Sequence, residues 1–384
     1  MSRSPKSSSY ELGLVESVAA IGPEVFAGLE GPERFPFLRY EWLDAFERSG
    51  CLGAERGWVP RHVVVRRGKE IVAVAPAYIK SNSMGEFVFD HQIAEFAESR
   101  LGVRYYPKLV LAVPFTPATG PRVLFAIGAD QSDREAVFER LTGGLADLCE
   151  KLGISSAHIL FPDAAQATEL AAHGWALREG IQFQFKNEGC STFDDYLAMF
   201  RAKQRAVIRR ERRELAQTGL EITELTGAGL AALEPRLAYE LYLTTVDKFV
   251  WGRRYLTPAF FERVLATMPE AIHVVLARAA DGEPLAGAFN LLGAEALYGR
   301  YWGAFREVKY LHFEVCLYRG VEAAIAHGLS RFEPGAGGEH KESRGFSATV
   351  TRSVHYYADA RLDRAVRDFY SRERESVEAR AAGD

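Results

Sequence analysis

Residues 331–346 carry the densest group of reactive side chains in the chain. They read R-F-E-P-G-A-G-G-E-H-K-E-S-R-G-F, so three glycines precede five ionisable residues within six positions. The apolar residues 329–332 predict a strand, which Pro334 ends. A strand end followed by a glycine loop and charged residues is a common way to build a site in α/β proteins. The same composition also suits a solvated surface turn.

The side chains of this stretch suit proton transfer to or from an amine. A histidine has a pKa near neutrality, so His340 could act as the general base, with Glu339 as the alternative. Lys341 supplies a cation beside them. We therefore predict that His340, Glu339 and Lys341 are catalytic and that Arg344 binds an anionic group of a substrate. A histidine in a charged loop is also often only solvated.

A second group of charges predicts a binding surface for phosphates. Residues 201–213 contain seven cations, and residues 194–216 are expected to form one basic helix. Steps of three and four residues place four of the arginines on one helix face. Arginine is a good bidentate partner for phosphate, so this face predicts a tRNA contact. The alternative is a solvated face balanced by acids such as Glu214. The four predicted phosphate-binding residues are Arg201, Arg205, Arg209 and Arg212.

Length and composition set the remaining limits. A chain of 384 residues with 48% hydrophobic residues is long enough for two domains. The net charge of −4 gives no global basicity, so any nucleic-acid surface must be local. Four scattered cysteines without a C-x-x-C pair predict reduced thiols and no metal site. No apolar run reaches about 18 residues, so we expect a cytoplasmic protein without a membrane span. Residues 1–11 are expected to be a disordered tail.

Two matches within the chain suggest that one structural unit is duplicated. Residues 62–65 read H-V-V-V and lead through Gly68 into an apolar run. Residues 273–276 read H-V-V-L and lead through Gly282 into a similar run. Further on, L-G-I-S before I-L-F-P at 152–162 parallels H-G-L-S before R-F-E-P at 327–334. Both matches keep the same order, as duplication of one α+β unit would produce. The alternative is a coincidence between valine-rich hairpins.

The element order and several strings resemble a known group of enzymes. A strand, two helices, a hairpin, an aromatic strand, a long helix and a further strand is the order of the GNAT acyltransferase fold. Two such units in tandem resemble the Fem-type peptidoglycan aminoacyltransferases and a Fem-related group of predicted N-acyltransferases. The strings that carry the resemblance are Y-Y-P-K-L at 105–109, P-F-T-P-A-T-G-P-R at 114–122, Y-W-G at 301–303, L-H-F-E-V-C at 311–316 and residues 332–346.

The resemblance implies an α+β fold of two tandem GNAT-like units. Each unit would have a central, mostly antiparallel sheet flanked by helices. The expected units are residues 12–187 and residues 190–384, the second with the basic helix and a terminal helix. The implied reaction is N-acyl transfer, in which an amide forms between an activated donor and an amine. The implied acceptor is a peptidoglycan precursor or peptide, and no tightly bound cofactor is expected.

The resemblance leaves the donor open between acyl-CoA and aminoacyl-tRNA. The glycine turn with which ordinary GNAT enzymes hold the CoA pyrophosphate is missing before the helix expected from residue 312. Glu314 in the first turn of that helix would repel a pyrophosphate. By analogy with Fem-type enzymes, aminoacyl-tRNA becomes the favoured co-substrate. An acetyl-CoA-dependent acetyltransferase and a non-catalytic ligand-binding protein are the alternatives, and the oligomeric state is open.

The resemblance also points to further substrate-binding residues. The aromatic strand near residue 300 should place Tyr301 and Trp302 on opposite faces, so that one lines a cleft and the other the core. The proline-rich stretch 114–121 is a stiff loop that carries hydroxyl groups. The predicted substrate-binding residues, besides Arg344, are Tyr301, Trp302, Glu314, Tyr105, Tyr106, Lys108, Thr116, Thr119 and Asp90.

Overall fold

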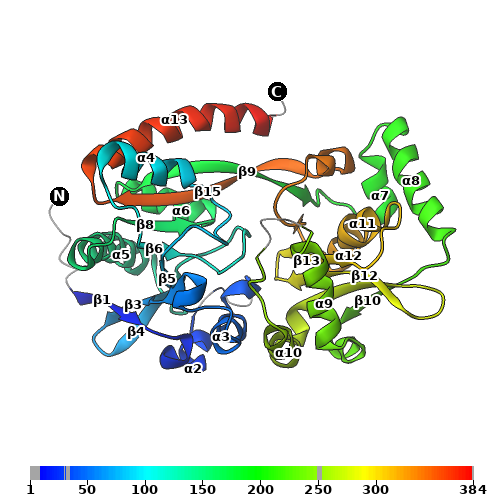
Figure 1. Cartoon of the computed structure of the whole chain (residues 1–384), viewed down its shortest axis with the longest axis horizontal. Helices are drawn as coiled ribbons and strands as arrows, with labels where there is room; N and C mark the ends of the chain where they lie inside the picture. The colour runs from blue at the N-terminus through cyan, green and yellow to red at the C-terminus, as the bar shows by residue number, and fades with distance from the viewer. Residues whose placement is uncertain (1–8, 30, 32–34, 249–252, 383–384) are drawn as a thin grey trace. The chain divides into compact units, whose positions relative to one another are not determined.

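The protein consists of two compact units, the first of which is built from two separate segments of the chain. The structure, a computed structural model, describes residues 9–29, 31, 35–248 and 253–382. Unit 1 contains Met1–Ile181 and Val350–Asp384, and unit 2 contains Gln182–Thr349 (Figure 1). The chain passes from unit 1 to unit 2 within one long strand, β9 (Ala176–Lys186), and returns within another, β15 (Ser347–Tyr357).

Unit 1 has two sheets and several covering helices. One sheet has the order β1-β3-β4-β7, and the other contains β9-β15-β8-β6-β5-β2. Most neighbouring strands are antiparallel, but β6 and β8 run parallel. Apart from β9 and β15, the strands are β1 (Tyr10–Val15), β2 (Trp58–Pro60), β3 (His62–Arg67), β4 (Glu70–Ala75), β5 (Ala77–Lys80), β6 (Lys108–Leu111), β7 (Leu124–Phe125) and β8 (Ser156–Leu160). The helices are α1 (Val18–Ile21), α2 (Pro23–Ala27), α3 (Tyr40–Arg48), α4 (His91–Leu101), α5 (Gln131–Leu152), α6 (Ala164–Ala172) and α13 (Ala360–Ala382).

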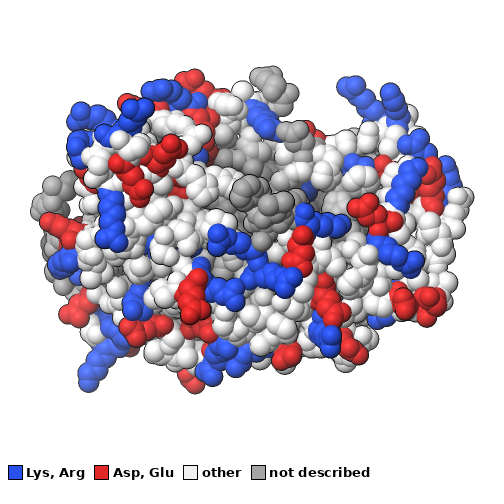
Figure 2. Space-filling view, viewed as in Figure 1, with Lys and Arg blue, Asp and Glu red and all other residues white. Residues whose placement is uncertain are grey.

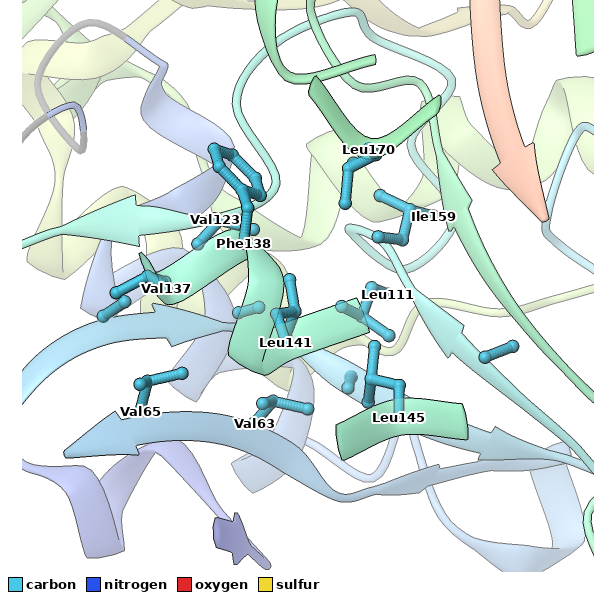
Figure 3. Close-up of a cluster of buried hydrophobic side chains, with 14 of the residues drawn as sticks. Val63, Val65, Leu111, Val123, Val137, Phe138, Leu141, Leu145, Ile159 and Leu170 are labelled. Atoms are coloured by element: carbon cyan, nitrogen blue, oxygen red, sulfur yellow. The ribbon is translucent and has the colours of Figure 1, made fainter. Parts of the chain in front are cut away.

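The core of unit 1 lies under α5. Val137, Leu141 and Leu145 are four residues apart and therefore share one face of this helix. They point toward Val63 of β3 and Leu111 of β6 (Figure 3). All five side chains are almost fully buried. The inner face of α5 thus follows from the four-residue spacing of its apolar residues.

Unit 2 repeats this mostly antiparallel arrangement of strands. Its strand order is β10-β11-β12-β13-β14-β9, and only β13 and β14 run parallel. The strands besides β9 are β10 (Glu221–Thr226), β11 (Ile272–Arg278), β12 (Pro284–Leu292), β13 (Ala296–Ala304) and β14 (Arg331–Glu333). The helices are α7 (Phe193–Ala198), α8 (Ala202–Ala216), α9 (Pro235–Val246), α10 (Pro258–Thr267), α11 (Leu311–Phe313) and α12 (Arg319–Ala326), with a π-helical turn over Glu314–Tyr318.

The predicted duplication is visible in the strand register. In unit 1, β1 pairs with β3 from Tyr10 opposite Arg67 to Val15 opposite His62. In unit 2, β10 pairs with β11 from Glu221 opposite Arg278 to Thr226 opposite His273. Each ladder ends at a buried histidine that is hydrogen-bonded to a glutamate, Glu47 in unit 1 and Glu224 in unit 2. The tandem α+β fold expected from the sequence is therefore present.

The boundaries differ from those expected. Residues 350–384, including α13, belong to unit 1 rather than to the second unit. A unit boundary falls inside each of the 11-residue strands β9 and β15. One part of each strand therefore belongs to unit 1 and the other part to unit 2. At the other end of the chain, residues 1–8 lie outside the described residues, and β1 begins at Tyr10, inside the expected tail.

The basic helix expected over residues 194–216 is two helices. Thr192 and Asp195 form a capping box at the start of α7. The chain leaves the helical conformation at Arg201, whose φ of −61° and ψ of 152° are extended, and α8 begins at Ala202. Arg201 therefore precedes α8 instead of lying within the helical stripe.

Candidate active site

The glycine loop follows the end of β14. The parallel pairing of β13 and β14 stops at Tyr298 and Glu333, after which the chain turns away at Pro334. Gly335, Gly337 and Gly338 have φ values of 92°, 74° and 91°. This left-handed region is strained for other residues, so the loop requires its glycines. The charged residues then form a 3₁₀ helix, Glu339–Arg344. The side chain of Glu339 lies outside the described part of the chain.

The side chain of Lys341 turns inward from this short helix. It is only 5% exposed, and its Nζ donates to the carbonyl oxygen of Gly335 at 2.8 Å. Burial lowers the pKa of Lys341 to about 8, while the nearby Cys316 acts in the opposite direction. Perturbed lysines in partly enclosed sites are candidates for proton transfer or anion binding. The solvated turn that the composition also allowed is thus excluded for Lys341.

The rings of His312 and Phe313 lie beside His340, the neighbour of Lys341 in the chain. The His340 ring is 5.7 Å from the ring of His312 and 5.8 Å from that of Phe313, measured between centroids. Burial and the neighbouring cations lower the pKa of His312 to about 4. The same causes lower the pKa of the more exposed His340. Both imidazoles are therefore neutral at physiological pH, the form that accepts a proton.

The aromatic strand divides its side chains as the alternation predicted. The Tyr301 ring packs against Tyr242, with centroids 5.5 Å apart, and against other aromatic residues of the core. The Trp302 ring instead contacts His312, with centroids 5.1 Å apart. Trp302 is therefore the member of the pair that lies near the loop. His312 was not among the predicted site residues, although it lies in the same string as Glu314, L-H-F-E-V-C at 311–316.

Arg344 is buried and already paired. Its guanidinium Nη2 lies 2.8 Å from Glu211 Oε1, and its Nε donates to the hydroxyl of Tyr318 at 3.0 Å. Its Nη1 donates to the carbonyl oxygen of His340, also at 3.0 Å. The guanidinium lies over the Phe313 ring at 3.4 Å from the centroid. Arg344 thus does not point into solvent, and its charge is neutralised by a residue of α8.

Glu314 and Arg212, which the sequence assigned to two separate functions, bind each other. Arg212 donates to both carboxylate oxygens of Glu314 at 2.9 Å, and to both oxygens of Glu322. Arg319 also donates to Glu314, at 3.0 Å. Because two arginines neutralise Glu314, its expected repulsion of a pyrophosphate at this helix start is weakened.

The other three arginines of the predicted stripe are more exposed. Arg201 and Arg209 are exposed and Arg205 is half-buried. Arg209 lies 3.3 Å from Asp194 in a solvated ion pair. Figure 2 shows basic side chains, with acidic ones between them, over α8 at the upper right of the molecule. Of the predicted stripe, Arg212 faces its own unit and the other three remain available to a partner.

Four of the predicted substrate-binding residues meet in unit 1. Lys108 Nζ binds Asp90 and lies 2.7 Å from Glu86 Oε2, and the Tyr105 hydroxyl donates to Asp90 at 2.7 Å. Ser83 Oγ joins Lys108 Nζ to the Tyr106 hydroxyl, with both distances 2.8 Å. Lys108 is 1% exposed. These side chains bind one another inside the unit, although Asp90 Oδ1 and Glu86 Oε1 are buried without a hydrogen bond.

Two charged members of this network, Lys80 and Glu86, were not predicted from the sequence. Lys80 stands opposite Lys108 in the pairing of β5 and β6, and its Nζ lies 3.9 Å from the ring centroid of Trp58. Burial lowers the pKa of Lys80 to about 7 and raises that of Glu86 to about 7. Lysine within an apolar strand run was the available signal, because such a side chain needs a buried partner.

The proline-rich loop of unit 1 is held by a residue that the sequence analysis did not select. Arg122 is 1% exposed and donates to the backbone carbonyls of Leu160, Ala118 and Gly120. Thr116 is buried and donates to the carbonyl of Pro114, whereas Thr119 is half-buried. The stiffness predicted from prolines is thus reinforced by one guanidinium.

The described residues contain neither a metal-ligand cluster nor a membrane-spanning helix. No three His, Cys, Asp or Glu side chains in this part of the chain are grouped as metal ligands would be. Within the same residues, no helix combines the length and the apolar character needed to cross a membrane.

The two units define a tandem GNAT-like fold. A family model of FemAB-like proteins, described as peptidoglycan biosynthesis/recognition, matches residues 17–383. The chain therefore belongs to the FemAB-like family. Among curated proteins, none matches the sequence significantly. The family and the fold together support a transferase of the aminoacyltransferase type.

Solved structures share the fold at low sequence identity. FemX is 13% identical with a TM-score of 0.52, and the match covers 93% of this chain and 100% of FemX. A conserved protein of unknown function from Bacteroides thetaiotaomicron is 11% identical with a TM-score of 0.54, covering 90% and 99%. L-PGS from Bacillus licheniformis is 10% identical with a TM-score of 0.50, covering 86% and 94%.

Proposed function

We propose that the protein transfers an aminoacyl group from aminoacyl-tRNA to an amine of a peptidoglycan precursor, in the cytoplasm. The amine nitrogen forms a bond to the donor carbonyl carbon, the ester bond to the tRNA breaks, and an amide results. The observation that carries the proposal is the buried Lys341 beside two neutral histidines in a member of the FemAB-like family. Positioning, proton removal and stabilisation of the oxyanion are what such a reaction needs.

We assign separate roles to the residues of the loop. His340, with its lowered pKa, takes the proton that the attacking amine loses, and the released ribose hydroxyl of the tRNA regains a proton. Lys341 is mostly cationic at neutral pH because its pKa is about 8. Its ammonium would stabilise the oxyanion or an anionic group of a substrate. Trp302 and His312 provide the adjoining wall. Glu339 stays the alternative base.

The exposed cations of α8 support tRNA over acyl-CoA as donor. Arg205 and Arg209 are one helical turn apart, so their guanidinium groups could follow a phosphate backbone. An acyl-CoA remains the second candidate, because Arg212 and Arg319 neutralise Glu314 near the start of α11. The substrate roles of Asp90, Tyr105, Tyr106, Lys108, Thr116 and Thr119 stay predictions, and so do those of Tyr301, Glu314 and Arg344.

Mass spectrometry of defined mixtures tests the proposed reaction. The protein would be incubated with a lysine-containing peptidoglycan precursor and either charged tRNA or acetyl-CoA. We expect a new amide on the precursor with charged tRNA, lost in Lys341→Met. If the amide forms with acetyl-CoA but not with charged tRNA, the donor is an acyl-CoA and the proposed donor is wrong. Binding of the precursor without product from either donor would instead support a non-catalytic binding protein.

A further inference from the structure

Helix α8 has an inner face that holds the candidate active-site loop. Glu211 lies on this face and is 4% exposed. Its two carboxylate oxygens are both used: Oε1 accepts from Arg344 Nη2 at 2.8 Å, and Oε2 accepts from the Tyr318 hydroxyl at 2.5 Å. A carboxylate buried so completely needs such partners, since an unpaired buried charge is costly. Glu211 therefore fixes the positions of both groups.

Arg344 carries this restraint to the reacting residues. Its Nη1 donates to the carbonyl oxygen of His340, the residue directly before Lys341 in the chain. Its Nε donates to the same Tyr318 hydroxyl that Glu211 holds. A planar guanidinium bound at three edges keeps a single orientation. The backbone of His340 is thus tied to α8 through one side chain.

Further contacts hold the same loop from α7 and α8. The Tyr196 hydroxyl donates to the carbonyl oxygen of Arg344 at 2.8 Å, and Gln204 Nε2 donates to that of Ser343 at 2.5 Å. Lys341 Nζ closes the loop at its other end by binding the Gly335 carbonyl. Figure 1 shows α7 and α8 beside α11 and α12 in unit 2. The loop is restrained on the side of α8 as well as from within.

We propose that Glu211 is a positioning residue, which acts through Arg344 to hold His340 and Lys341 in their reactive arrangement. The inference rests on the proposed function for its catalytic consequence. Without the Glu211 charge, Arg344 would be a buried cation without its counterion and would move toward solvent. The carbonyl of His340 would lose its donor, and Lys341 would leave its enclosed position.

The test compares Glu211→Gln with Glu214→Gln on the same helix. Glu214 instead pairs with the exposed Lys309 at 3.1 Å and with Arg210 of its own helix, so it is a matched control. The titration of Lys341 would be followed by pulsed acylation and peptide mass spectrometry from about pH 6 to about pH 11. Hydrogen exchange of residues 335–346 would be measured in parallel.

We expect the Lys341 midpoint, near 8 in the unaltered protein, to rise by about one unit or more in Glu211→Gln. Exchange of the loop should become about tenfold faster. With charged tRNA, kcat should fall about tenfold or more while KM for the acceptor changes less than about threefold. Glu214→Gln should leave all three quantities unchanged. Tyr318→Phe, which keeps the Glu211–Arg344 pair, should change them in the same direction by less, and it replaces Glu211→Gln if that variant does not fold.

The outcomes separate this inference from the proposed function. If the Lys341 midpoint and loop exchange in Glu211→Gln equal those of Glu214→Gln, the positioning role is wrong. If kcat and KM change together in proportion to lost stability, Glu211 is only structural and the proposal is also overturned. If the midpoint and exchange change as expected but the unaltered protein forms no amide with either donor, the proposed reaction fails while the control of Lys341 by Glu211 stands.

Discussion

His158 Nδ1 and His355 Nδ1 lie 2.7 Å apart, although 197 residues separate them in the chain. They stand opposite each other in the antiparallel pairing of β8 and β15. Each Nε2 is hydrogen-bonded to a serine hydroxyl, His158 to Ser156 and His355 to Ser353. A bond between two Nδ1 atoms requires one to donate and the other to accept, so the neutral pair contains two different tautomers.

This pair predicts loss of stability in acid. Burial, with Lys108 near both rings and Arg178 near His355, lowers both histidine pKa values well below 6.5, while Asp90 opposes this at His355. The unfolded chain binds more protons below pH 6.5, so stability is complete above that pH and falls as the pH drops toward the folded pKa. Each histidine contributes a slope of about 1.4 kcal/mol per pH unit.

Urea unfolding at several pH values checks this prediction. In His355→Gln, the free energy of unfolding should change with pH less steeply below pH 6.5, by about 1.4 kcal/mol per pH unit. His91→Gln, at an exposed position of α4, is the control and should keep the original slope. Equal slopes in His355→Gln and the unaltered protein would mean that the pair does not resist protonation.

Two buried lysines of unit 1 should respond differently to removal of their charge. Lys108→Met leaves Glu86 and Asp90 without their cation and should destabilise the protein by about 3–5 kcal/mol at pH 7. Lys80, with a pKa of about 7, is about half charged there. Lys80→Met keeps the packing on Trp58 and loses a hydrogen bond to Met84, at a cost of about 0.5–1.5 kcal/mol. Urea unfolding of both variants measures the difference, and similar losses would contradict it.

The pH profile of amide formation reports on Lys341. If its ammonium is required, kcat at saturating acceptor should fall as the pH rises through about 8, because lysine is cationic only below its pKa. Lys341→Arg should keep the cation and lose this alkaline limb. His340→Gln should lower kcat about 100-fold, with KM little changed. An alkaline limb that persists in Lys341→Arg would assign it to another group.

The arginines of α8 should differ in what they stabilise. Arg205→Ala and Arg209→Ala should each reduce the log–log salt slope of tRNA binding by about 0.7–0.9, as expected for one lost phosphate contact. Arg212→Ala should instead cost about 1.5–3 kcal/mol of stability, since Glu314 and Glu322 lose a charged donor. Titrations of tRNA at increasing salt measure the slopes. Arg236→Ala, on the exposed face of α9, is the control. Unchanged slopes for both Arg205→Ala and Arg209→Ala would leave α8 a solvated face.

The features that the sequence determined by itself depend on residues near one another in the chain. The inner face of α5 follows from the spacing of Val137, Leu141 and Leu145. The capping box of Thr192 and Asp195 and the opposite directions of Tyr301 and Trp302 follow from helix and strand geometry. The repeated hairpins whose first strands carry His62 and His273 at or near their starts were likewise visible as local strings. Such features need no knowledge of the rest of the fold, because backbone periodicity alone sets them.

Only the tertiary structure decided which charges meet. Arg212 and Glu314 are 102 residues apart in the chain. The sequence predicted a separate binding role for each, whereas the fold pairs them with each other. The sequence predicted that Arg344 binds an anionic group of a substrate, but in the fold its guanidinium is paired with Glu211. The sequence also did not predict that α13 belongs to unit 1. A charge lowers its energy by pairing with whichever opposite charge the fold brings near, and that proximity depends on the three-dimensional path of the chain rather than on sequence spacing.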